Sequence, residues 1–264
     1  MSTQRLLNAA AATLAAGVAA DSATEHFRAG FHNRAMFVAP AVAAAVVISS
    51  TTAALRSHAV GRVGSATFAS GIIAGLIGFG FHLRNTSRRV GGWTVSSNVF
   101  YGAPAAAPLA LTMAGLVGSI ASRLGERPTV ERRESYAVAG LAVAGLAGTA
   151  MEAGALHFRG AFQNPLMYSP VVLPPIAAAT LATAVLSQSV SAKRVATASL
   201  QLTAWLGVAG TCLHAWGMHR RMGGWRNWRQ NLFAGPPLPA PPAFTALSLA
   251  GLAGLQLVES SGPR

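Results

Sequence analysis

Two histidine-containing stretches of the chain are near copies of each other. HFRAGFHN occupies residues 26–33 and HFRGAFQN occupies residues 157–164, 131 positions further along. Each copy is preceded, five residues before its histidine, by an acid: Asp21 in the first and Glu152 in the second. Imidazole and carboxylate groups are the ligands that iron, zinc and copper sites use in proteins. The duplicated stretches therefore contain candidate metal ligands.

A second pair of stretches repeats at a spacing of 132 residues. FHLRNTSRRVGGW (81–93) matches LHAWGMHRRMGGW (213–225), which aligns His82 with His214, and NVFYGAP (98–104) matches NLFAGPP (231–237) one residue further out of step. Most apolar positions differ between the copies, whereas the acid, the histidines, the arginines, the asparagines and GGW are retained. Self-similarity over this length indicates a tandem duplication.

The retained acids and histidines predict a metal site in each half of the chain. Two imidazoles and one carboxylate are the ligand set of non-haem iron sites, and of zinc or copper sites in which water completes the coordination. The expected ligands are Asp21, His26, His82, Glu152, His157 and His214. Five residues turn a continuous helix by about 140°, so an acid and the histidine after it converge only if the helix breaks between them. Pairing of each acid with an arginine, and hydrogen bonding of each histidine between helices, remain open alternatives.

A non-covalent haem is a second interpretation of the same histidines. It requires two histidines at one depth on facing helices, such as His26 with His82 and His157 with His214, and cationic groups near the propionates. The chain lacks a CxxCH attachment motif, and its single cysteine, Cys212, excludes an intramolecular disulfide. It also lacks GxSxG, P-loop, HExxH and dinucleotide-binding motifs.

The other retained residues suggest anion binding and anchoring at a membrane surface. A guanidinium presents a planar fork to carboxylate or phosphate, so the duplicated arginines are candidate substrate ligands or partners of the acids: Arg28, Arg88, Arg89, Arg159, Arg220 and Arg221. Tryptophans of GGW match an aromatic belt. The residues expected to position the chain at the interface are Asn33, Asn164, Trp93, Trp225, Asn98 and Asn231.

Composition places these motifs in a membrane protein. The chain is 52% hydrophobic and 10% charged, against about 25% charged residues in soluble domains. Apolar segments rich in Ala, Leu and Gly favour membrane helices over strands, at about 6–22, 38–55, 64–82, 101–122, 136–153, 167–187, 195–214 and 238–258. The net charge of +13 lies mostly between these segments, which argues against nucleic-acid binding.

The fold predicted from these patterns is an all-α integral membrane protein of eight transmembrane helices. Residues 1–122 form the first four-helix repeat, 123–135 a charged linker, and 136–264 the second repeat. An even number of helices per repeat gives both repeats the same orientation, with a pseudo-two-fold axis along the membrane normal. The segment 6–22 resembles a signal peptide, but its equivalent 136–153 lies inside the chain, so we expect a retained helix.

Charge distribution predicts the orientation of these helices. Each side of the predicted membrane carries ten Lys and Arg residues, but six on the motif side are the duplicated arginines. Excluding those six leaves an excess of positive charge beside the termini. The positive-inside rule then places the termini in the cytoplasm and the motif loops in the periplasm, as in a bacterial inner-membrane protein.

Three classes of function follow from this organisation, and the sequence does not decide whether the protein is an enzyme. The first is a redox-metal or haem protein with an anion held by the arginines. The second is a secondary transporter that binds its substrate between the repeats. The third is a non-catalytic subunit or scaffold, with membrane-protein partners or further copies of the chain beside the lipid bilayer.

Overall fold

The chain folds into helices in every part that the structure covers. The structure is a computed structural model that describes residues 2–56, 61–102, 104–126 and 131–261. These ranges contain α-helices and short 3-10 helices and no β-strand. The prediction of an all-α fold is therefore confirmed. Residues 127–130 of the predicted linker lie outside the described ranges, and so does Arg264. Two of the counted positive charges, Arg127 and Arg264, are therefore not described.

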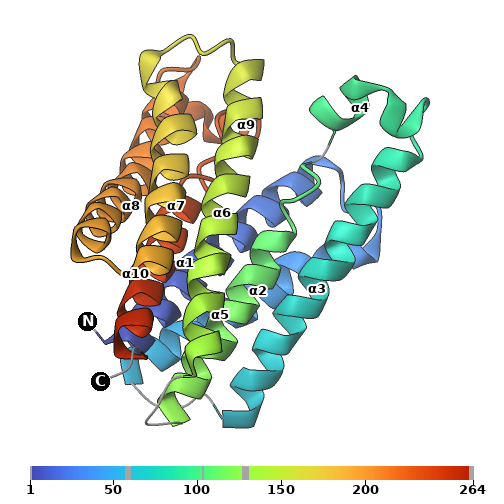
Figure 1. Ribbon diagram of the computed structural model, residues 1–264. Helices are drawn as coiled ribbons and strands as arrows, with labels where there is room; N and C mark the ends of the chain where they lie inside the picture. Colours follow the sequence, from blue (N-terminus) through green and yellow to red (C-terminus); the bar gives the residue numbers. More distant parts are fainter. Residues whose placement is uncertain (1, 57–60, 103, 127–130, 262–264) are drawn as a thin grey trace.

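Long helices make up most of the described chain (Figure 1). The long helices are α1 (Thr3–Arg28), α2 (Val38–Arg56), α3 (Gly61–Ser87), α5 (Leu109–Glu126), α6 (Arg132–Arg159), α7 (Ser169–Ser187), α8 (Val190–His219) and α10 (Pro242–Ser260). The short elements, which follow α1, α3, α6 and α8, are η1 (Arg34–Phe37), η2 (Gly92–Thr94), α4 (Ser96–Phe100), η3 (Pro165–Tyr168), η4 (Gly224–Asn227) and α9 (Trp228–Ala234).

Six helical segments within the described residues are long and apolar enough to cross a membrane. They are Thr3–Arg28, Arg34–Leu55, Gly61–Ser87, Arg132–Arg159, Pro165–Ser187 and Pro242–Ser260. Large apolar side chains point away from the protein, among them Ile73 and Ile77 on α3 and Leu202 and Trp205 on α8. Contiguous apolar surface of this kind is typical of contact with lipid. The helices and their surfaces together indicate a membrane protein.

Two helices begin later than the apolar segments that predicted them. The segments start at about 101 and 238, whereas α5 begins at Leu109 and α10 at Pro242. Prolines precede both helices, and proline favours the start of a helix because it lacks a backbone N–H and disrupts a helix interior. The residues between Pro104 and Leu109 form turns instead. Neither α5 nor α8 belongs to the six candidate membrane spans.

Helices α1 and α10 lie at the centre of the packing. Helix α1 contacts α2, α5 and α10, and α6 contacts α7 and α10. Small residues at these contacts allow close approach: a Cβ atom at Gly254 of α10 would lie 3.0 Å from the backbone nitrogen of Ala139 in α6. Close packing of small residues stabilises helix association in lipid, where dispersion forces replace the hydrophobic effect.

The duplicated motifs lie at the end of the molecule opposite the two termini (Figure 1). Both marked termini are at the lower left, and Thr3 Oγ1 donates a hydrogen bond to Gln256 Oε1 at 2.9 Å near them. The labelled α4 and α9, which contain Asn98 and Asn231, lie at the upper end. One end of the bundle therefore holds the chemistry-bearing residues, and we call it the motif end.

Candidate functional site

All four duplicated histidines form the same type of hydrogen bond. His26 Nδ1 lies 2.5 Å from Met36 O, and His157 Nδ1 lies 2.9 Å from Met167 O. The other two bonds join His82 Nδ1 to Pro104 O at 2.8 Å and His214 Nδ1 to Pro237 O at 2.7 Å. A carbonyl oxygen only accepts, so each Nδ1 carries the hydrogen and donates it. In the neutral imidazole, Nε2 is then unprotonated and can bind a metal or accept a hydrogen bond.

A tight turn after α1 and after α6 returns a carbonyl group to the first histidine of each half. Phe31 and Phe162 adopt positive φ angles of 43° and 45°, which are uncommon for residues with a side chain. Phe31 stacks on Phe37 at 4.2 Å between ring centroids, and Phe162 stacks on Tyr168 at 4.4 Å. These stacked rings hold the turn against the start of the next helix.

Asn33 and Asn164 cap the 3-10 helices that follow these turns. Asn33 Oδ1 accepts a hydrogen bond from the backbone nitrogen of Ala35 at 2.9 Å, and Asn164 Oδ1 accepts one from Leu166 at 2.9 Å. An asparagine side chain satisfies a backbone N–H that a helix start would leave unpaired. Each asparagine thus fixes the start of η1 or η3, a short distance before the methionine carbonyl that receives the histidine bond.

A glycine pair and an asparagine shape the segment that follows α3 and α8. Gly91 and Gly223 have φ angles of 78° and 77°, which place them in the left-handed region that glycine adopts readily. Asn98 Nδ2 donates to the carbonyl groups of Val90 and Gly92, each at 2.9 Å. Asn231 Nδ2 donates in the same way to Met222 O at 3.3 Å and Gly224 O at 2.8 Å. Each loop is therefore held closed by the side-chain amide of its own asparagine.

Replacing Asn231 with alanine is expected to lower the free energy of unfolding by about 1–3 kcal/mol, because two carbonyl groups lose their donor. Asn231 is only 4% exposed, so water replaces the amide poorly. Denaturant titration of the detergent-purified protein measures the change. Asn85→Ala, at an exposed amide near the end of α3, is the control and should change stability little. Equal stability of the two variants would contradict this role for Asn231.

Each acid lies on the same continuous helix as the histidine that follows it in sequence. Helix α1 runs unbroken through Asp21 and His26, and α6 runs unbroken through Glu152 and His157. Each acid is thus turned about 140° from its histidine around the helix axis. Asp21 and Glu152 lie within electrostatic range of each other, on the two different helices. Asp21 is also within electrostatic range of His26, the histidine that follows it on α1.

No group of three or more His, Cys, Asp or Glu side chains within the described residues is arranged to hold a metal ion. The six expected ligands are all among those residues. His157 and His214 do lie within electrostatic range of each other, and both are partly buried. Two expected ligands of the second half therefore lie near each other, without a third His, Cys, Asp or Glu grouped with them among the described residues. The set of one acid and two histidines stays a prediction.

Arg28 lies within electrostatic range of Asp21, and Arg159 lies within electrostatic range of Glu152, although neither arginine forms a close ion pair with that acid. Arg28 pairs with Glu25 at 2.7 Å on the exposed surface of α1. The guanidinium carbon of Arg159 lies over the ring of Phe100 at 5.0 Å and over that of Tyr101 at 5.6 Å. The remaining four are exposed at the motif end: Arg88, Arg89, Arg220 and Arg221.

Aromatic contacts at the motif end join residues from the two halves of the chain. Phe27, next to His26, stacks on Phe233 of α9 with 4.9 Å between ring centroids. Phe158, next to His157, meets Phe100 of α4 edge to face at 5.8 Å. Trp93 and Trp225, predicted to lie in an aromatic belt, are about half exposed. Each short helix therefore contacts the end of the long helix in the other half.

Three buried polar side chains near the opposite end were not predicted from the sequence. Asn8 on α1, Ser50 on α2 and Ser122 on α5 are buried, and their side-chain polar atoms have no hydrogen-bond partner among the described residues. Helices α1, α2 and α5 contact one another. Ser50 lies within the predicted apolar segment 38–55. Asn8 and Ser122 carried no signal, because a single polar residue in an apolar helix does not reveal which way it faces.

Comparison with known proteins assigns no family to the chain. No protein-family model matches it, and no curated protein and no solved structure does. The function is therefore inferred from the geometry of the protein's own residues.

Proposed function

We propose that this protein spans the membrane with eight helices and binds a redox metal or a non-covalent haem through pairs of histidines at the motif end. His157 and His214 form one pair, and His26 and His82 form the equivalent pair. The observation that supports this proposal is the shared hydrogen bond of all four Nδ1 atoms, which leaves every Nε2 available. Metal-binding histidines in proteins commonly donate their other nitrogen to a carbonyl in this way.

The eight helices form two four-helix repeats, residues 1–122 and 136–264, in this proposal. Equivalent positions make equivalent bonds: the histidine bonds above, the caps by Asn33 and Asn164, and the loop bonds by Asn98 and Asn231. A duplicated chain that keeps the same side-chain bonds at the same positions would keep the same local structure. The pseudo-two-fold axis then runs along the membrane normal, between the two acids.

A bound haem or redox metal would supply one-electron chemistry at this end of the protein. The Nδ1 hydrogen bonds fix the tautomer and the orientation of the imidazole rings that would hold the group. Arg159 and the exposed arginine pairs offer guanidinium groups for haem propionates or for an anionic substrate. The aromatic contacts of Phe27 and Phe158 fix the helix ends on which the first histidines lie.

The motif end faces the periplasm of a bacterial inner membrane in this proposal, and the termini lie in the cytoplasm. The excess of Lys and Arg on the side of the termini supports this orientation once the duplicated arginines are set aside. Cysteine labelling from outside intact cells tests it. A cysteine at Arg88 should react with a membrane-impermeant maleimide in a Cys212→Ala background, whereas a cysteine at Ser2 should react only after lysis.

The test of the function is an optical spectrum and a metal analysis of the protein purified in detergent. A haem bound by two histidines would give a Soret band and, after reduction, sharp α and β bands at longer wavelength. A metal would be found at about one equivalent per histidine pair. The absence of stoichiometric iron, copper, zinc or haem, after expression with each supplied, would refute the proposal.

A scaffold or non-catalytic subunit is the second candidate. The observation that favours it is that each histidine bond joins a helix to a carbonyl 10 to 23 residues away, so the bond stabilises the loop without any ligand. Partner proteins or further copies of the chain would then bind the motif end. A His82→Ala, His214→Ala double variant that loses assembly, in a protein whose spectrum shows no bound group, would support the scaffold.

A secondary transporter is the third candidate. It is favoured by the buried Asn8 and Ser50 side chains, whose polar atoms have no partner among the described residues. Substrate sites of repeat-built transporters lie between helices and contain such groups. Asn8→Leu would abolish uptake in a transporter, whereas a histidine-held redox centre would keep its spectrum in the same variant.

A further inference from the structure

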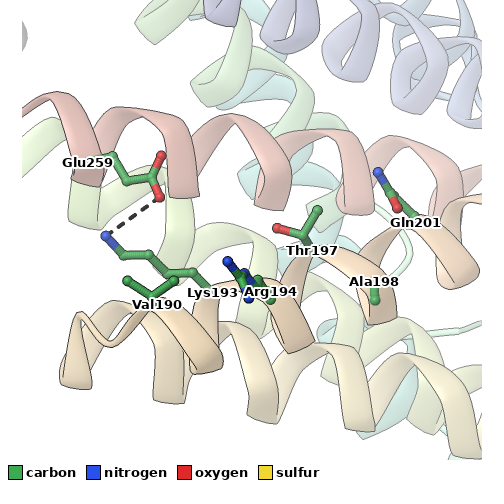
Figure 2. Close-up of a pocket in the computed structure, with 7 residues that line it drawn as sticks. All are labelled: Val190, Lys193, Arg194, Thr197, Ala198, Gln201 and Glu259. Carbon is green, nitrogen blue, oxygen red and sulfur yellow. Dashed lines mark ion pairs between the residues drawn. The ribbon is translucent and has the colours of Figure 1, made fainter.

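An open cavity lies at the end of the protein that carries the termini. It has a volume of about 390 Å³ and is bounded by the start of α8 and the end of α10. Figure 2 shows its lining residues, Val190, Lys193, Arg194, Thr197, Ala198, Gln201 and Glu259. None of them belongs to the duplicated motifs.

The cavity carries an excess of one positive charge. Lys193 Nζ lies 3.5 Å from Glu259 Oε1, and this pair is drawn as a dashed line in Figure 2. Arg194 forms no hydrogen bond or ion pair with another described residue. Its guanidinium is therefore free to bind an anion, and phosphate fits its planar set of donors.

Polar groups beside the two cations could also bind a phosphate. Lys193, Thr197 and Gln201 follow one another at intervals of four residues, which places them on one face of α8. The Thr197 hydroxyl and the Gln201 amide offer neutral donors to a phosphate or glycerol oxygen. Thr197 has no hydrogen-bond partner among the described residues. The cavity thus contains a charged end and a polar wall along the same helix.

Charge distinguishes this cavity from another at the same end of the bundle. The other cavity, of about 410 Å³, is bounded by α3, α5 and the start of α6. Two arginines and two glutamates line it, and Arg123 pairs with Glu134 at 3.6 Å. Its charges balance, so it offers an anion no net attraction. The cavity on α8 is the one whose charge favours a phosphate.

Apolar side chains beside the cavity indicate that the phosphate belongs to a lipid. Val190 and Val195 are 66% and 55% exposed, and Leu202 and Trp205 continue the exposed apolar surface along α8. A soluble anion makes no use of such a surface. The acyl chains of a phospholipid would cover it while the headgroup lies in the cavity.

We propose that this cavity binds the phosphate headgroup of an anionic phospholipid. Lys193 and Arg194 contact the phosphate, Thr197 and Gln201 hydrogen-bond its oxygens, and the acyl chains lie along the outer face of α8. Glu259 competes with the lipid for Lys193. The proposal is independent of the histidine centre, because the two sites share no residue and lie at opposite ends of the protein.

The test is native mass spectrometry of the full chain with phosphatidylglycerol, with phosphatidylcholine as the neutral-headgroup comparison. The wild type should retain phosphatidylglycerol in preference. Arg194→Gln should weaken its binding about fivefold, since each Lys or Arg near the headgroups contributes about 1 kcal/mol. Glu259→Gln should strengthen binding, because it frees Lys193. Arg62→Gln is the matched control, as Arg62 is exposed near the start of α3 and lines neither cavity.

Three results would overturn the proposal. The first is equal retention of the two lipids by the wild type. The second is equal weakening by Arg194→Gln and Arg62→Gln, which would indicate a general surface-charge effect. The third is displacement of phosphatidylglycerol by millimolar inorganic phosphate with no dependence on the acyl chains, which would make this a site for a free anion.

Discussion

Replacing His157 and His214 together with alanine is expected to remove half of the haem or metal bound per protein molecule. In the proposed arrangement each half holds one group through two histidines, so loss of both ligands would leave that half without a bond to the group. Alanine at His26 and His82 as well should remove the remainder. Absorbance of the Soret band per mole of protein, or metal content by mass spectrometry, measures the loss.

His32→Ala and His219→Ala are the controls for this experiment. Both histidines are exposed at the motif end, and neither has a counterpart in the other half. Their replacement should leave the spectrum unchanged. Full retention of the group in the His157→Ala, His214→Ala variant would contradict the assignment of these ligands. Size-exclusion chromatography of each variant separates loss of the group from loss of the fold.

Much of the helical organisation is predictable from the sequence, because apolar segments of sufficient length specify membrane helices locally. The segment 6–22 lies within α1, and 136–153 lies within α6. The helix ends are less predictable. Pro104 and the residues after it are apolar enough to extend a hydropathy segment, but the proline conformation and the turns that follow it delay α5 to Leu109.

The site is only partly predictable, since its hydrogen bonds depend on backbone conformation. Comparison of the copies singles out His26 and His157, but not their carbonyl partners at Met36 and Met167. Those partners depend on the positive φ angles of Phe31 and Phe162. A phenylalanine does not predict a positive φ angle, because glycine is the residue that usually adopts one.

Side-chain pairing was the least predictable feature of the site. Arg28 was considered as a partner of Asp21, yet it pairs with Glu25, three residues before it on the same helix face. Residues three and four apart on a helix are neighbours, which favours the local partner. The absence of an ion pair between Arg194 and another described residue was likewise not predictable from the sequence, because whether an arginine is paired depends on the helix packed beside it.

Two glycines at helix contacts are expected to be sensitive to substitution by alanine, which should lower the stability of the fold. A Cβ atom at Gly75 of α3 would lie 2.6 Å from the backbone nitrogen of Thr112 in α5 and 2.7 Å from Pro108 O. At Gly207 of α8 it would lie 2.8 Å from both Thr245 N in α10 and the carbonyl oxygen of Pro241, which precedes α10. Real Cβ atoms do not approach backbone so closely, so alanine forces the two helices of each pair apart.

Gly75→Ala and Gly207→Ala are each expected to lower the free energy of unfolding by about 2–3 kcal/mol, the upper range for overpacking. Denaturant titration in detergent measures it. Separation also breaks a bond between helices, from Thr112 Oγ1 to Ile72 O at 3.3 Å or from Thr245 Oγ1 to Ala204 O at 2.7 Å. Such a bond contributes about 0.6 kcal/mol in membranes. Thr245→Val should therefore cost much less than Gly207→Ala.

Gly80→Ala is the matched control, because Gly80 lies on the same helix as Gly75 and no atom lies within 4 Å of its added Cβ. Helix propensity should make that variant neutral or slightly more stable. Equal destabilisation by Gly75→Ala and Gly80→Ala would mean that helix α3 tolerates alanine nowhere, and the close approach would not be the cause. Similar losses at Gly75 and Gly207, which lie 132 residues apart, are instead what two repeats with one packing geometry require.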